Sequence, residues 1–204
     1  MVLVAWAIGV NVTISLIVTP PPYAWSFQKQ ALSWLAPLIG AIIAGTWGHW
    51  FNDYLQRSYI RKHNGLYVLE NRLWGVDAPT IIGVADLVLY GQCFQHTLHW
   101  MVVLVAWAMI AFSMIAGTTA VSAYCLDAFP NHASLVAAII NMWRTTGGLC
   151  VGFFQLKWIF TSGAGLSFGL QAMVLAVAFL GGVVPTQVFG RKWRMKHPPP
   201  KAEN

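Results

Sequence analysis

The chain has 204 residues, of which 57% are hydrophobic and only 9% are charged. Soluble domains carry roughly 25% charged residues, so this composition excludes an ordinary soluble domain and predicts an integral membrane protein. The formal net charge of +6 does not indicate nucleic-acid binding, because the basic residues fall in short clusters between apolar runs. The three cysteines, Cys93, Cys125 and Cys150, have no metal-ligand spacing and predict no disulfide.

Six apolar segments follow one another along the chain. A membrane-spanning helix needs about 17–25 residues, and the expected spans are 1–19, 32–51, 78–95, 99–124, 133–159 and 166–189. The third is the weakest, because it is short and contains Asp86. We therefore expect an all-α, six-helix membrane bundle over residues 1–190, followed by a basic, proline-rich tail over 191–204.

Lysine and arginine residues are distributed unequally between the two sides of such a bundle. The connection 52–77 contains four of them and the tail contains five, whereas the opposite side has only Lys29 and Lys157. Because basic residues favour the cytoplasmic side of a membrane, we expect both termini and the 52–77 loop to be cytoplasmic. The expected location is a multi-pass protein of the plasma membrane rather than of an internal membrane.

The first span starts without polar flanking residues. Met1 is followed directly by apolar residues, and neither a basic leader region nor a small-residue cleavage site is present. This pattern does not fit a secretory signal peptide. It suggests that a segment upstream of Met1 is missing.

The longest polar segment begins at Gly48 and reads GHWFNDYLQRSYIRKHNGLYVLENRLW. Gly48 permits close approach of another backbone. Asp53 and Arg57 are four residues apart, so they share a helix face if the helix continues beyond the membrane. Glu70 and Arg72 stand just before the next span. Opposite charges at neighbouring helix ends predict a latch that holds one conformation. A solvated, positively charged loop with incidental acidic residues is the alternative.

This segment resembles the signature loop of the major facilitator superfamily, in the form found between the eighth and ninth helices. The likeness is to the fungal multidrug branch, of the drug:proton antiporter kind. The matching residues are Gly48, Asp53, Arg61, Lys62, Asn64, Gly65, Glu70, Arg72 and Leu73. One position departs from the family pattern, because Leu69 stands where the family has a proline before the glutamate.

Three further stretches carry the same resemblance, which therefore covers the whole chain. Residues 20–23 resemble the Pro–Pro–Tyr sequence after the seventh helix of the family. The family's Tyr–x–x–Asp–x–Tyr–Pro turn between the tenth and eleventh helices is matched by Tyr124, Asp127 and Pro130. Its eleventh helix is matched by Asn141, Arg144, Gly152, Phe154 and Trp158.

The resemblance implies a carrier with twelve helices in two halves, which moves a small molecule by alternating access as the halves rock around a central site. This chain resembles the C-terminal half only. The implied cytoplasmic latch comprises Gly48, Asp53, Arg57, Arg61, Glu70, Arg72 and Asp127. The implied partners are the lipid bilayer, a small-molecule substrate, and a complementary N-terminal half or a second copy. A non-transporting remnant and an interaction subunit of a full carrier are the alternatives.

Arg144 lies about 11 residues, or ~16 Å, into the fifth expected span. A lone cation at that depth costs at least about 2.5–3.5 kcal/mol, so it requires a polar cavity or a partner group. Asn141 lies one turn earlier on the same face. The pair is either a cavity or coupling site, or a tether that bonds to carbonyl groups within the bundle.

Two other polar residues lie inside expected spans. Asp86 is the only acidic residue deep in a span, and it is either a proton-exchanging group or a packed structural acid. The resemblance places its helix outside the substrate cavity. It places Asn11, on the first span, at the cavity. The candidate cavity or coupling residues are therefore Asn11, Asn141, Arg144 and Asp86.

One short motif raises the remote alternative of an intramembrane serine hydrolase. Residues 165–169 fit the pattern Gly–x–Ser–x–Gly around Ser167. Such chemistry needs a histidine within hydrogen-bond reach of the serine, and only His96 and His99 are expected on the same side. These two histidines also lack the further ligands of a metal site. We therefore expect no enzyme activity, no cofactor and no metal.

Overall fold

The computed structural model describes residues 2–21, 23–62 and 69–196. No β-strand occurs in these ranges, which confirms the all-α prediction. The elements are α1 (Val2–Val18), α2 (Phe27–Ser33), α3 (Leu35–Lys62), the 3₁₀ helix η1 (Leu69–Val76), α4 (Asp77–Gln95), α5 (Trp100–Ala128), the 3₁₀ turn η2 (Pro130–His132), α6 (Ala133–Ser162), α7 (Ala164–Ala178), the π-helical turn η3 (Phe179–Val183) and α8 (Val184–Lys196).

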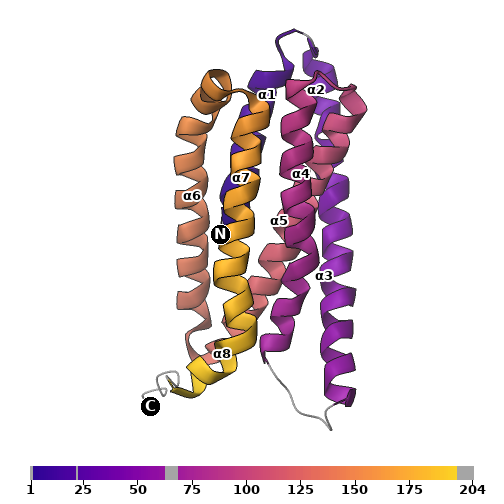
Figure 1. The fold of residues 1–204 in the computed structure, drawn as a ribbon. Coiled ribbons are helices and arrows are strands. Elements are labelled where there is room, and N and C mark those ends of the chain that lie inside the picture. The colour runs from indigo at the N-terminus through magenta and orange to yellow at the C-terminus, as the bar shows by residue number, and fades with distance from the viewer. Residues whose placement is uncertain (1, 22, 63–68, 197–204) are drawn as a thin grey trace.

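The long helices run side by side along one axis (Figure 1). In this view α6 and α3 stand at the two sides of the bundle, with α4, α5 and α7 between them and α1 passing behind α7. The main packing pairs are α3 with α5, α4 with α5 and α7, and α1 with α6. We call the end that holds the end of α3, η1 and α8 the basic end. The other end, which holds the turns at 19–26, 96–99 and 163, is the turn end.

Local sequence explains where the helices change direction at the turn end. Gly163, between α6 and α7, has a φ of +84°, which glycine adopts without the steric cost of a side chain. Before α5, the Nδ1 atom of His99 accepts a hydrogen bond from the backbone N–H of Met101 at 3.3 Å and so caps the helix. These two features let adjacent helices run antiparallel with short connections.

The connection expected over 52–77 differs from the structure in its first half. Helix α3 continues to Lys62, and η1 then begins at Leu69. Residues 52–62 contain neither proline nor glycine, so nothing in the sequence ends the helix where the apolar run ends. Composition marks the expected end of the apolar span, whereas the helix itself ends later.

Four helices of the described chain are long and apolar enough to cross a membrane: Phe27–Arg61, Arg72–Gln95, Trp100–Ala128 and Ala164–Gly190. Helix α1 is apolar but shorter, and α6, with 30 residues, is not among these four. Large apolar side chains face outward, as with Phe153 at 80% exposure. The protein is thus an integral membrane protein. That the chain crosses the membrane six times remains a prediction.

The core lies where α1, α4, α5 and α7 meet. Its largest fully buried side chains include Trp107, Tyr90 and Phe168. The rings of Tyr90 and Phe168 pack edge to face with centroids 5.1 Å apart, a favoured geometry for aromatic pairs. This packing joins α4 to α7 and holds the middle of the bundle together.

Candidate functional site

A polar network at the basic end begins with an arginine that joins three elements. The Nη1 atom of Arg72, on η1, lies 2.8 Å from Oδ2 of Asp127, near the end of α5. The Nε–H of the same guanidinium donates to Oε1 of Gln56 on α3 at 2.9 Å. One arginine therefore connects η1 to both α3 and α5, and the structure brings together two of the residues expected in the latch.

A second set of bonds attaches the last helix to the same region. The side-chain amide of Gln187, on α8, donates to Oδ1 of Asp77 at 2.7 Å and to the carbonyl oxygen of Leu73 at 3.0 Å. Asp77 begins α4, and Leu73 follows Arg72 on η1. The basic end is thus tied across η1, α3, α4, α5 and α8 by side chains rather than by apolar packing alone.

The central ion pair of the network is partly exposed to solvent. The side chains of Arg72 and Asp127 are 27% and 31% exposed, so water competes for both charges. Partly exposed ion pairs contribute about 0–1 kcal/mol each. Contacts of this size can hold one arrangement of helix ends and still be exchanged for another, which is what a conformational latch requires.

Three other charged residues of the expected latch, Asp53, Arg57 and Arg61, take no part in these bonds within the described chain. Asp53 and Arg57 line a shallow depression of about 310 Å³ on α3 with His49, Trp50 and Tyr54. Within the described chain, the two form no ion pair with each other. Arg61 is exposed near the end of α3. The side chain of Glu70 lies outside the described residues.

The close backbone approach expected at Gly48 is not found within the described chain. A methyl group on Gly48 would meet only the Thr119 side chain, at an ordinary 3.8 Å. The close approach is instead at Gly40, where an added Cβ would lie 2.2 Å from the carbonyl oxygen of Ala108. The reason is that α3 and α5 come nearest two turns before Gly48, which the spacing of glycines in the sequence does not reveal.

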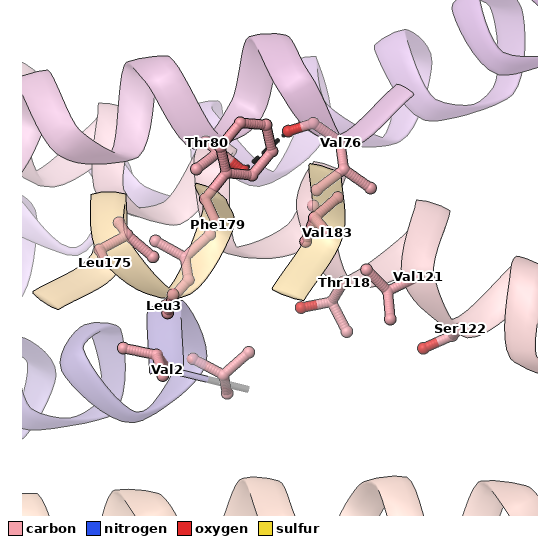
Figure 2. A pocket seen from close by; sticks show the side chains of 13 residues that line it. Val2, Leu3, Val76, Thr80, Thr118, Val121, Ser122, Leu175, Phe179 and Val183 are labelled. Atoms are coloured by element: carbon pink, nitrogen blue, oxygen red, sulfur yellow. Dashed lines mark hydrogen bonds between the residues drawn. The ribbon is translucent and has the colours of Figure 1, made fainter. Parts of the chain in front are cut away.

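An apolar cavity of about 250 Å³ lies between α1, α4, α5 and α7 (Figure 2). Figure 2 shows Leu3, Leu175 and Phe179 on one side of it and Thr118 with Val121 on another. The Thr80 hydroxyl donates to the carbonyl oxygen of Val76 at 2.8 Å (Figure 2). The remaining residues that line the cavity are Val2, Val4, Gly117, Ser122, Ala178 and Val183. The candidate coupling residues named from the sequence do not line this cavity.

Asn11 and Asp86 are both occupied by bonds inside the bundle. The Asn11 Oδ1 atom accepts a hydrogen bond from the indole N–H of Trp107 at 2.7 Å, which joins α1 to α5. Asp86 is fully buried, and its Oδ2 accepts from the Ser113 hydroxyl at 2.8 Å, which joins α4 to α5. Both residues hold helix pairs together in this arrangement.

Comparison with known proteins finds relatives among membrane transporters. The chain is 26% identical over 178 residues to an uncharacterised MFS-type transporter of Schizosaccharomyces pombe, covering 86% of this chain and 30% of that protein. It is 25% identical to the MFS antiporter QDR3 of Candida albicans (83% and 24% covered) and 23% identical to Quinidine resistance protein 3 of Saccharomyces cerevisiae (81% and 24% covered). The chain is homologous to transporters of the major facilitator superfamily. No family model and no solved structure matches it.

The matches cover most of this chain but only a small part of each relative. Most of this chain is matched, yet it spans less than a third of the length of each of these major facilitator proteins. This proportion is consistent with a half of such a transporter. The relatives are transporters rather than enzymes, which supports the expectation that this chain is not an enzyme.

Asn141 and Arg144 lie on the outer side of α6. The Nη1 atom of Arg144 is 3.5 Å from Oδ1 of Asn141, at the long limit of a hydrogen bond. Asn141 is exposed and Arg144 half-buried. The pair therefore sits away from Asn11 and Asp86, and the structure does not gather the four candidate residues into one site.

The serine of the Gly–x–Ser–x–Gly pattern has a structural role. Ser167 is fully buried at the start of α7, and its hydroxyl lies 2.8 Å from the carbonyl oxygen of Gly163 and 3.3 Å from that of Trp158. These bonds fasten the α6–α7 turn. With its proton engaged by backbone carbonyls, Ser167 is placed as a packing residue of the helix bundle and not as a nucleophile.

Three residues of the network escaped sequence reasoning: Gln56, Asp77 and Gln187. Gln56 and Gln187 carry no charge and belong to none of the motifs found in the sequence. Asp77 resembles an ordinary acidic residue in the first turn of a helix. One signal was available for Gln56, since it falls beside Arg57 in the polar extension of α3. For Gln187, on a different helix far along the chain, the sequence offers none.

Proposed function

We propose that this chain is the C-terminal six-helix half of a major facilitator carrier, and that it moves a small molecule across the membrane by alternating access. The proposed partner is a complementary N-terminal half, with a second copy of the chain as the other arrangement. On this proposal both termini and the basic end face the cytoplasm of a cell whose plasma membrane holds the carrier.

The observation that carries the proposal is the ion pair between Arg72 and Asp127. These residues come from the two separate motifs that resemble the family's loops, one before α4 and the other at the end of α5. A salt bridge between them is the contact expected of a cytoplasmic latch. Homology to transporters over 81–86% of the chain supports the same function.

The proposed mechanism uses the weakness of the network. In one conformation Arg72 and Gln187 hold η1, α5 and α8 together. Asp53, Arg57 and Arg61 lie on the last turns of α3 at the same end. Rocking of the halves exchanges these contacts for others of similar free energy. Asn141 and Arg144, on the outer side of α6, are the candidates for the surface that faces the other half or the substrate.

Transport is tested in yeast with quinidine as the probe, a compound named only for the relative Quinidine resistance protein 3. Cell-associated quinidine is measured with this chain alone, with the first half of that relative alone, and with both together. The proposal expects lower accumulation only when both are present in the membrane fraction. Lower accumulation with this chain alone would favour a second copy as the partner. Unchanged accumulation with both inserted would contradict carriage of this probe.

The latch assignment has a separate test in the same cells. Asp53→Ala is expected to abolish quinidine export while the protein remains in the membrane fraction after alkaline extraction. Lys157→Ala, at an exposed position on α6 near the turn end, is the matched control and should export normally. Normal export by Asp53→Ala would remove that residue from the latch.

A further inference from the structure

A second cavity, of about 630 Å³, opens at the turn end. It lies between the segment that links α1 to α3 and the segment that links α4 to α5, and its volume falls in the range of small-molecule sites. Its apolar wall is formed by side chains that include Tyr23, Trp25, Leu32 and Trp100. This cavity is far from the network at the basic end and plays no part in the proposed latch.

Hydrogen bonds hold the two walls in a fixed relation. The Tyr23 hydroxyl donates to the carbonyl oxygen of Leu98 at 2.8 Å, and the carbonyl oxygen of Cys93 is a second acceptor at 3.1 Å. Burial raises the pKa of this hydroxyl, so it remains a proton donor. Thr97, which lines the cavity, and Ala24, between the lining residues Tyr23 and Trp25, have φ values of +47° and +45°. Residues other than glycine adopt this conformation rarely, where their surroundings impose it. The cavity is therefore built into the fold.

The cavity is positively charged and lacks a compensating acid. Lys29 is the one charged residue among its lining residues. It forms no ion pair within the described chain, and residues 19–33 and 93–104 contain neither aspartate nor glutamate. His99 adds a donor, because its Nδ1 accepts from Met101 and the proton of the neutral ring then sits on Nε2. These groups suit an anionic, oxygen-rich ligand.

An apolar stripe runs from the cavity along the neighbouring helix. Leu32 lines the cavity and belongs to a helical run that continues from Phe27 to Arg61. Further exposed side chains follow it on α3, spaced three or four residues from one turn to the next, which places them on one face of that helix. Each is more than half exposed: Leu32, Leu35, Ile39, Ile42 and Ile43. Within the described chain this stripe is not covered by another helix, and it lies next to the cationic pocket.

We propose that this cavity binds one phospholipid of the adjacent leaflet, with its phosphate group at Lys29 and His99 and an acyl chain on the stripe from Leu32 to Ile43. Tryptophan, lysine and histidine at the edge of a bilayer lie at the depth of lipid headgroups. A free anion would use the charge but leave the stripe and the aromatic wall unexplained. A lipid uses all three features. The inference does not depend on the carrier function.

Native mass spectrometry of the purified chain in detergent tests this site. Dioleoyl phosphatidylglycerol is the probe, and dioleoylglycerol, which has the same chains without phosphate, is the lipid control. We expect one bound phosphatidylglycerol and no retained dioleoylglycerol. Lys29→Met keeps the apolar stem but not the charge, and should lower lipid occupancy about tenfold at subsaturating lipid. Lys157→Met, near the same end but outside the cavity, should bind as the unmodified chain does.

A second pair of variants guards against misfolding of the first. His99→Asn retains an acceptor for the helix cap and should also lower occupancy, whereas His96→Asn, beside the cavity, should not. Equal binding by Lys29→Met and Lys157→Met, or equal retention of the two lipids, would overturn the proposal in favour of non-specific lipid. Displacement of phosphatidylglycerol by millimolar inorganic phosphate would also overturn it, since the site would then be one for a free anion.

Discussion

The guanidinium of Arg72 lies 2.8 Å from the carboxylate of Asp127 and at the same time donates to Gln56. These contacts join η1, α5 and α3 at the basic end, in addition to the packing between these three elements. Because the same arginine serves two partners, its loss should release both helices. Loss of either partner should release only one.

The coupling between Arg72 and Asp127 can be measured by a double-mutant cycle. We expect Arg72→Ala and Asp127→Ala to show a coupling free energy of about 0.2–1 kcal/mol, because both side chains are partly exposed. Thermal denaturation in detergent gives the stabilities, and 0.5 M salt should reduce the coupling by screening. The pair Arg57→Ala and Asp127→Ala is the control and should be additive. A coupling of zero would mean that the salt bridge is not maintained in solution.

Substitution of Gln187 should loosen α8 from the start of α4. Gln187→Leu removes the donor to Asp77 and Leu73 and is expected to cost about 1–2 kcal/mol of unfolding free energy. Gln187→Glu should cost more at neutral pH, because it sets a second carboxylate against Asp77. Val188→Ala, at an exposed position next to it, is the control. Equal stability of the Leu and Glu variants would argue against the bond to Asp77.

Gly40 and Gly45 form a matched pair on α3. An alanine at Gly40 would push its Cβ to 2.2 Å from the Ala108 carbonyl oxygen, so α3 and α5 must separate, whereas nothing lies within 4 Å of a Cβ at Gly45. We expect Gly40→Ala to destabilise the fold by about 1–3 kcal/mol. Gly45→Ala should be neutral or slightly stabilising, since alanine favours helix. Thermal denaturation of the two variants compares them directly, and similar melting temperatures would contradict the close approach.

Loss of the Ser113 hydroxyl should lower the free energy of unfolding, because this hydroxyl donates a hydrogen bond to the buried Asp86. Ser113→Val removes the side-chain donor that the carboxyl group has in the described structure, and an unsatisfied buried polar group costs about 1–3 kcal/mol. Adding Asp86→Leu should recover most of that loss. Thr119→Val on the same helix, whose hydroxyl bonds only to Ile115, is the control. Failure of the double variant to recover stability would show that Asp86 has another stabilising role.

Several features of this protein could be predicted from its sequence. A composition of 57% hydrophobic and 9% charged residues admits few structures besides a helical membrane bundle, since a membrane requires internal satisfaction of backbone hydrogen bonds. The resemblance also placed Arg72 and Asp127 in one expected set of seven latch residues, without pairing them. Both predictions rest on information that is local or is carried by resemblance.

The end of α3 shows where such information stops. The apolar run predicted a span ending at residue 51, yet the helix continues to Lys62. Hydropathy reports where a helix leaves the hydrocarbon, and helix propensity reports where it stops. In this segment the two signals disagree, because residues 52–62 are polar but contain no helix breaker.

The sequence by itself determined the class of the protein, its helices and the two charges at the centre of its polar network. Only the tertiary structure decided that Gln56, Asp77 and Gln187 complete that network, that Gly40 rather than Gly48 is the site of close approach, and that Lys29 stands in a cavity without an acid. The physical reason is that these properties depend on which faces of distant helices meet. Local patterns determine each helix and its apolar face, whereas the pairing and rotation of helices are set by the packing of the whole bundle.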